Sequence, residues 1–231
     1  MPTDLEKILR LQTWLSPSFP VGGYSFSHAL EAAIEADLVR CADSLLNWLE
    51  ADLTVGAGRV DALLLCASWR AVSARDAEAL IDVAALAAAL RGTAEFSLEA
   101  EAQGAAFLST VTKVWCSETL LWASDCLKSA EITLVLPVAV GMACAAEELP
   151  LELSTSFFLH ALVANLVSAA VRAVPLGQTD GQRVIASLEA DIVHIASEAL
   201  ACDLDDIGSA TLMIDVLSMH HETQYTRIFR S

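Results

Sequence analysis

Residues 172–183 read Arg-Ala-Val-Pro-Leu-Gly-Gln-Thr-Asp-Gly-Gln-Arg, and they separate the most apolar helical stretch of the chain from the next helical stretch. Val174 precedes Pro175, and a residue in that position is disfavoured in the α conformation, so a helix is predicted to end here. Thr179 and Gln182 have the spacing of a capping box, which predicts that the next helix begins at this point. The chain therefore turns a corner between two helices.

This corner carries more polar groups than two helix ends need. Gly177 is expected to supply the free backbone angle of a tight turn. Asp180 would face the positive end of the following helix dipole. Neither role accounts for Arg172, Gln178 and Arg183, so we interpret the corner as a possible contact surface.

Composition limits the class of protein. Of the 231 residues, 55% are apolar and only 19% are charged, which favours a compact core and leaves apolar faces for partners. Thirty acidic residues stand against thirteen Lys and Arg, giving a net charge of −17. A surface with this charge repels phosphate backbones, so we exclude a nucleic-acid-binding role.

Cysteine spacing and the amino-terminal sequence indicate a cytoplasmic protein. The six cysteines form no CxxC pair, so neither a zinc ribbon nor a redox motif is predicted. No basic segment followed by an apolar run marks a signal peptide. Residues 153–171 lack a formal charge over nearly the length of a membrane span, but they contain several polar side chains. We expect this stretch to be a buried core helix, with no membrane contact.

Helical periodicity and capping signals predict an all-α fold, a single-domain bundle of about ten helices over residues 1–219. Residues 15–24 break the periodicity with two prolines and two adjacent glycines, and we expect an ordered loop there. The expected helices cover residues 3–15, 25–36, 42–55, 59–72, 76–90, 93–115, 118–126, 137–146, 151–173, 179–201 and 209–219.

The last twelve residues, 220–231, differ from the rest of the chain and are called the C-terminal tail below. They read His-His-Glu-Thr-Gln-Tyr-Thr-Arg-Ile-Phe-Arg-Ser. Terminal segments are usually frayed, but Tyr and Arg are favoured anchors at interfaces. We therefore predict a docking segment that orders on a partner, anchored by Tyr225, Arg227, Phe229 and Arg230.

No enzymatic motif is present. The sequence lacks a P-loop, an HExxH motif and a GxSxG elbow, so no catalytic residue and no cofactor are predicted. Neighbouring imidazoles suit nickel, which makes His220 and His221, with Glu222, weak metal-ligand candidates. Adjacent residues on a helix do not face one direction, which counts against a shared metal site. Direct nickel binding by these residues is therefore the alternative function and not the main one.

Three stretches resemble one known family. Residues 15–31, Leu-Ser-Pro-Ser-Phe-Pro-Val-Gly-Gly-Tyr-Ser-Phe-Ser-His-Ala-Leu-Glu, resemble the amino-terminal signature of the UreF family of urease accessory proteins. The corner at residues 172–183 and the tail resemble the second and third signatures. Tyr24 and Phe26 are swapped relative to the common pattern, Ala29 replaces a common Gly, and His220 stands where a basic residue is more usual.

The resemblance implies an all-α chaperone that does not catalyse a reaction itself. Proteins of this family work with UreD (also called UreH) and the GTPase UreG to load nickel into apo-urease, and they often form homodimers. We expect the same partners here. The residues expected to contact them are Pro20, Gly22, Gly23, Tyr24, Ser25, Glu31, Arg172, Gln178, Gln182, Tyr225, Arg227, Phe229 and Arg230.

Overall fold

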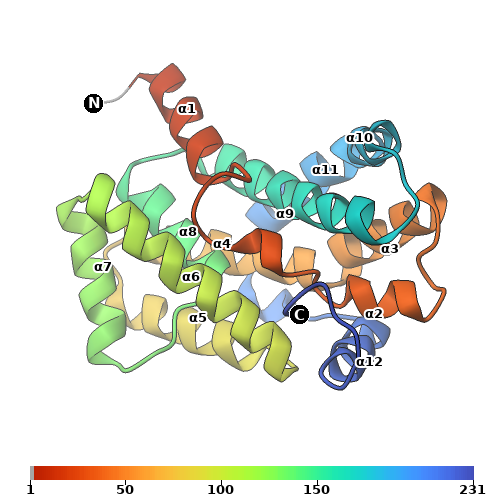
Figure 1. Cartoon of the computed structure of the whole chain (residues 1–231). Helices are drawn as coiled ribbons and strands as arrows, with labels where there is room; N and C mark the ends of the chain where they lie inside the picture. The colour runs from red at the N-terminus through yellow and green to blue at the C-terminus, as the bar shows by residue number, and fades with distance from the viewer. Residues whose placement is uncertain (1–2) are drawn as a thin grey trace.

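A computed structural model describes residues 3–231, and this range contains twelve α-helices, two short 3-10 turns and no strand (Figure 1). The predicted all-α fold is confirmed. The first half of the chain contains α1 (Asp4–Trp14), η1 (Gly23–Ser25), α2 (Leu30–Glu35), α3 (Ala42–Val55), α4 (Ala57–Ser73), α5 (Ala77–Ala89) and α6 (Ala94–Val114). The second half contains α7 (Glu118–Ser129), α8 (Leu136–Ala146), α9 (Leu151–Ala173), α10 (Gln178–Ser187), α11 (Glu189–Ala201), η2 (Leu204–Asp206) and α12 (Leu212–His221).

The centre of the bundle is the pair α4 and α8, with α5, α6 and α7 on one side and α9, α10 and α11 on the other (Figure 1). Helix α8 is apolar on every face and buried from Pro137 to Ala145. Gly141 allows the close approach of α4, because a Cβ atom there would meet the Ser68 hydroxyl and lie 2.5 Å from the Leu65 carbonyl oxygen. Small residues at this contact therefore bring the two central helices together.

Helix α9 is the charge-free stretch that raised the question of a membrane span. It is long and apolar enough to cross a membrane by length and composition, and half of its most apolar window is buried inside the protein. It packs against α4, α10 and α11. These contacts are those of a core helix, as expected from its polar side chains.

The corner after α9 was predicted correctly in place but not in detail. Val174 is extended, with φ −112° and ψ 150°, and ends α9 as expected before Pro175. Gly177 has an ordinary φ of −74° and is itself the N-cap, because its carbonyl oxygen accepts the Gly181 N–H at 3.1 Å. The predicted Thr179 cap is therefore wrong, and Thr179 lies in the first turn of α10.

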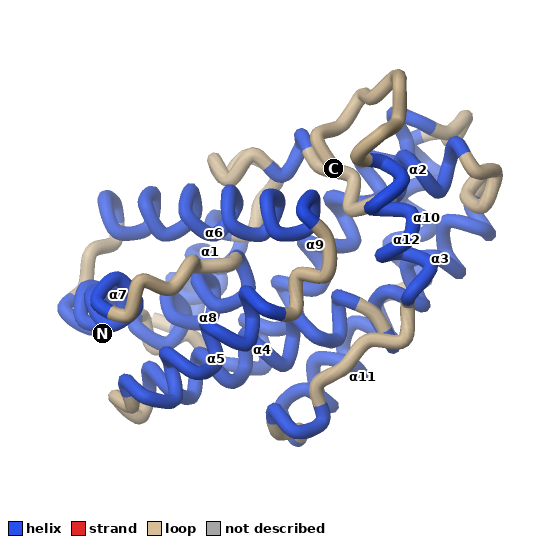
Figure 2. The backbone as a smooth tube through the Cα atoms, turned by 90° about the horizontal axis from the view of Figure 1, so that it is seen from below, coloured by secondary structure: helices blue, strands red, loops and turns tan. Residues whose placement is uncertain are grey.

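Several further boundaries differ from the prediction. The expected helix over residues 25–36 begins only at Leu30. The expected helix over residues 179–201 is two helices, α10 and α11. They are separated at Leu188, whose N–H donates to the Ile185 carbonyl oxygen three residues earlier at 3.1 Å. The expected boundary between residues 219 and 220 falls inside α12, which continues to His221. Residues 222–231 leave α12 without regular helix, and they lie beside α2 and η1 (Figures 1 and 2).

The chain enters α2 through an unusual backbone. His28 and Ala29 both take left-handed conformations, with φ of 54° and 63°. The Cβ atom makes this conformation cost about 1–2 kcal/mol for residues other than glycine. Ala29 is fully buried, so the surrounding core holds it in place.

Replacing Ala29 with Gly is expected to raise the free energy of unfolding by about 0.5–1 kcal/mol, because relief of the left-handed strain exceeds the extra chain entropy of glycine. Urea unfolding followed by circular dichroism measures the change. Ala33→Gly, in the right-handed interior of α2, is the control and should lower the same free energy by about 1 kcal/mol. Equal destabilisation by both substitutions would contradict the strain at Ala29.

Candidate partner-binding site

The side chain of Arg172 connects the three stretches that the sequence singled out. Its Nη1 donates to the Tyr24 carbonyl oxygen at 3.0 Å, and its Nε donates to the Ser168 carbonyl oxygen at 3.1 Å. The guanidinium carbon lies 3.7 Å from the centroid of the Tyr24 ring and 4.4 Å from that of the Phe229 ring. Such contacts stabilise a cation over aromatic faces. The amino-terminal loop, the corner and the C-terminal tail thus meet at one residue.

A hollow of about 450 Å³ lies beside this contact, between α9, α10 and the amino-terminal loop. Exposed Gln178 and Gln182 border it from α10, and Tyr24 and Arg172 border it from the other side. The remaining lining residues are mostly small or apolar: Pro17, Ala164, Val167, Ser168, Val171, Gly181 and Ile185. Four of the residues expected to contact partners therefore surround one concave surface.

Glu31 holds the C-terminal tail on the body of the protein. One of its carboxylate oxygens accepts the backbone N–H of Ile228 at 2.7 Å, and the other accepts that of Phe229 at 2.9 Å. Nε2 of His221 lies 3.0 Å from the second oxygen. Glu31 is only 7% exposed. Both carboxylate oxygens of Glu31 are therefore bonded to groups of the same chain.

Backbone pairing continues this attachment to Ser231. The N–H of Arg230 donates to the Ser25 carbonyl oxygen, and the N–H of Ser27 donates to the Ser231 carbonyl oxygen, both at 2.8 Å. The Ser231 hydroxyl donates to Glu99 at 2.7 Å. The Phe229 side chain is buried below this short extended segment. The tail was expected to order on a partner, but in the structure it is already ordered on its own chain.

A second set of charges fixes the start of the tail. Nδ1 of His221 lies 2.7 Å from a carboxylate oxygen of Glu95, and Nη1 of Arg227 donates to the other oxygen at 2.8 Å. His221 is completely buried, and both of its ring nitrogens face carboxylates. This pairing compensates the burial of the charges.

His28 lies next to the same network and stacks on Phe96 with ring centroids 4.4 Å apart. Its Nδ1 lies 3.6 Å from Glu99. Burial lowers the pKa of His28, but its interaction with Glu99 and the charges of Asp52 and Asp61 more than offset this effect and raise the pKa to about 9. Burial also raises the pKa of Asp52. His28 and Glu99 therefore extend the buried group of titratable side chains beside the tail, since Glu99 also accepts from the Ser231 hydroxyl.

The residues expected to contact partners fall into three groups. Glu31 and Phe229 are buried and hold the tail, and Gly23, Ser25 and Arg172 are partly buried. Arg227 keeps 38% of its side chain exposed while pairing with Glu95. With Arg227, the exposed group consists of Pro20, Gly22, Tyr24, Gln178, Gln182, Tyr225 and Arg230.

The three residues of the direct nickel-binding alternative do not converge. His220 and Glu222 are exposed, whereas His221 is buried between Glu31 and Glu95. Within residues 3–231, no group of three or more His, Cys, Asp or Glu side chains has an arrangement that could hold a metal ion. Adjacent positions at the end of α12 point in different directions, as the helical geometry predicts.

Sequence reasoning missed several residues of the tail attachment. Ser27, His28, Glu95 and Glu99 were not connected with the tail, although each is polar and each is now buried. The available signal was the acidic pair Glu95 and Glu99, which are four residues apart and so share one face of an amphipathic helix.

Removing the Glu31 carboxylate is expected to lower the free energy of unfolding by about 3 kcal/mol, because two backbone donors and His221 lose a buried charged acceptor. The variant is Glu31→Ala, measured by urea unfolding. Glu35→Ala, at the exposed end of the same helix, should change that free energy by less than about 0.5 kcal/mol. Similar values for both variants would show that Glu31 does not hold the tail.

His28 makes the stability of the protein depend on pH. Because its pKa is raised from 6.5 to about 9 on folding, its contribution is complete below pH 6.5 and is lost as the pH rises through 9. Between these values the free energy of unfolding should fall by about 3 kcal/mol more in the wild type than in His28→Gln. Parallel pH profiles of the two proteins in urea unfolding would rule out this role.

Comparison with known proteins is consistent with the three signatures. The family model for UreF matches residues 39–189. Urease accessory protein UreF of Rhodopseudomonas palustris (strain HaA2) is 49% identical over 224 residues, covering 97% of this chain and 93% of the relative. The protein of the same name from Bradyrhizobium sp. (strain ORS 278) is 47% identical, and the alignment covers 99% of this chain and 93% of the relative. That from Granulibacter bethesdensis is 45% identical, and the alignment covers 97% of this chain and 94% of the relative. The chain belongs to the UreF family of urease accessory proteins.

Proposed function

We propose that this protein is an adaptor for urease maturation, which binds UreD (UreH) and recruits the GTPase UreG for GTP-dependent assembly of the nickel centre of apo-urease. Membership of the UreF family supports the general role. The named partners and the recruitment of the GTPase follow from the resemblance of the three signatures. The adaptor itself needs no catalytic residue and no cofactor.

The convergence of the three signatures at Arg172 carries this proposal. Tyr24, Arg172 and Phe229 lie in three stretches far apart in sequence, and their side chains are in direct contact. Exposed Gln178 and Gln182 border the hollow beside these side chains and offer amide groups for hydrogen bonds to a partner. Aromatic and arginine side chains at the centre of a patch are typical of binding hot spots.

The two parts of this surface have different proposed partners. The tail presents Tyr225, which is fully exposed, and Arg230 to UreD. The hollow bordered by Arg172 and Gln178 is the proposed binding site for UreG. We further propose that the protein acts in the cytoplasm as a homodimer, with the acidic charge of −17 keeping it soluble before assembly.

A pull-down with UreD, UreG and GTP tests both parts of the proposal. The double variant Tyr225→Ala/Arg230→Ala should retain less than about a tenth of the UreD, because two interface anchors are removed without touching buried Phe229. Arg172→Glu should lose UreG to a similar extent, since it reverses the charge beside the hollow.

The matched control is Lys128→Glu on α7, whose side chain is 72% exposed, pairs with Asp125 and lies outside the proposed surface. It should capture both partners as the wild type does. All variants must keep the wild-type circular dichroism spectrum and melting midpoint. Full capture of both partners by folded Tyr225→Ala/Arg230→Ala and Arg172→Glu would refute the proposed interfaces.

A further inference from the structure

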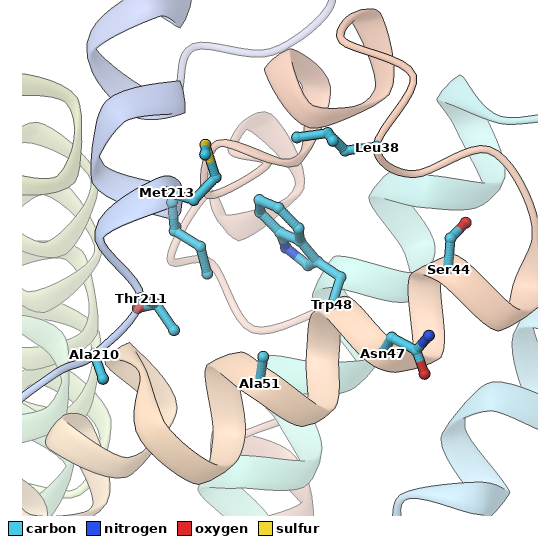
Figure 3. Close-up of a pocket in the computed structure, with 9 residues that line it drawn as sticks. Leu38, Ser44, Asn47, Trp48, Ala51, Ala210, Thr211 and Met213 are labelled. Carbon is cyan, nitrogen blue, oxygen red and sulfur yellow. The ribbon is translucent and has the colours of Figure 1, made fainter.

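A second concave surface lies between α3 and α12 and shares no lining residue with the Arg172 hollow. It encloses about 350 Å³ and is lined mainly by Leu38, Trp48, Ala51, Met213 and Ile214. Figure 3 shows the Trp48 indole rising from α3 toward Met213 on α12, with Leu38 on the far side. Ser44, Asn47, Ala210 and Thr211 complete the lining. We call this surface the α3–α12 groove.

Large apolar side chains at the groove are exposed to solvent. Leu38 is 48% exposed and Met213 is 58% exposed, on opposite sides of the partly buried Trp48. Along α12, Leu212 and Met219 are also largely exposed. Contiguous apolar surface with an aromatic residue at its centre marks a site for binding another molecule.

Exposed acidic side chains outnumber exposed bases beside the groove. Three of them directly precede residues that line it: Asp37 before Leu38, Asp43 before Ser44 and Glu50 before Ala51. The exposed base on the same stretch is Arg40. Asp43 also stands one helical turn before Asn47 on α3. An occupant of the groove therefore meets an apolar centre with negative charge around it.

We propose that the α3–α12 groove binds a cationic amphipathic helix of a partner protein. Leu-type side chains of such a helix would enter the groove beside Trp48, and its Lys and Arg side chains would face the acidic surroundings. A second copy joined symmetrically through this groove is a poor occupant, because Asp37, Asp43 and Glu50 would face the same acids of the other copy, so the homodimer proposed above would use another face. Phosphate-bearing ligands and anionic membranes are repelled for the same reason.

A fluorescent peptide of about 18 residues, with Leu on one helical face and Lys on the other, is the probe for this site. Its affinity for the full chain is measured by anisotropy at about 0.15 M salt. A peptide of the same composition with the sequence scrambled, so that it has no apolar face, should bind at least about tenfold more weakly.

Two double variants separate the apolar and charged contributions. Leu38→Ser/Met213→Ser removes exposed apolar groups and should weaken binding about tenfold. Asp37→Asn/Asp43→Asn should weaken it about threefold, with a smaller dependence on salt. The matched control is Leu5→Ser/Leu9→Ser on α1, which changes two side chains that are 66% and 51% exposed outside the groove. This control should bind as the wild type does.

Wild-type affinity in folded Leu38→Ser/Met213→Ser, or equal affinity for the scrambled peptide, would overturn the proposal. Light scattering on the same proteins provides a separate check. If the wild type is a dimer and Leu38→Ser/Met213→Ser is a monomer, the groove is covered by a second copy and the cationic partner helix is rejected. The groove variants leave the Arg172 surface intact, so failure here is distinguishable from failure of the UreD and UreG pull-down.

Discussion

The buried carboxylate of Glu31 is the constraint on which the partner-facing end of the molecule depends. A buried anion must be paired, and here two backbone N–H groups of the tail and the His221 ring supply the partners. Glu31 reaches them because His28 and Ala29 turn the chain sharply into α2. The tail cannot leave without stranding this charge, so the amino-terminal loop and the tail form one structure.

The proposed adaptor role depends on how these contacts gather three stretches that are far apart in the sequence. Holding Phe229 on Arg172 brings the tail, the corner and the Tyr24 loop to one surface. Short-range contacts with α9 orient the guanidinium, because its Nε donates to Ser168 one turn earlier. Exposed Tyr225 and Arg230 on the tail and the glutamines of α10 are then positioned relative to one another, which is what an assembly of several proteins requires.

Local signals predicted the helices well and the long-range polar contacts poorly. The helices at residues 42–55 and 151–173 were placed correctly, because glycines or proline and apolar periodicity define their ends. The break at Leu188 was missed, since the local sequence has no proline or glycine there to mark a helix end. The role of Glu31 depends on partners nearly two hundred positions away, which no local pattern encodes.

The central claim is that Glu31 holds the tail on the free protein. Amide hydrogen exchange at Ile228 and Phe229, measured by NMR on the chain alone, tests it most directly, because both N–H groups donate to this carboxylate. The structure predicts exchange slowed at least about a hundredfold relative to an unstructured peptide, with Tyr225 unprotected as an internal reference. Exchange of Ile228 and Phe229 at the unprotected rate of Tyr225 would contradict the account.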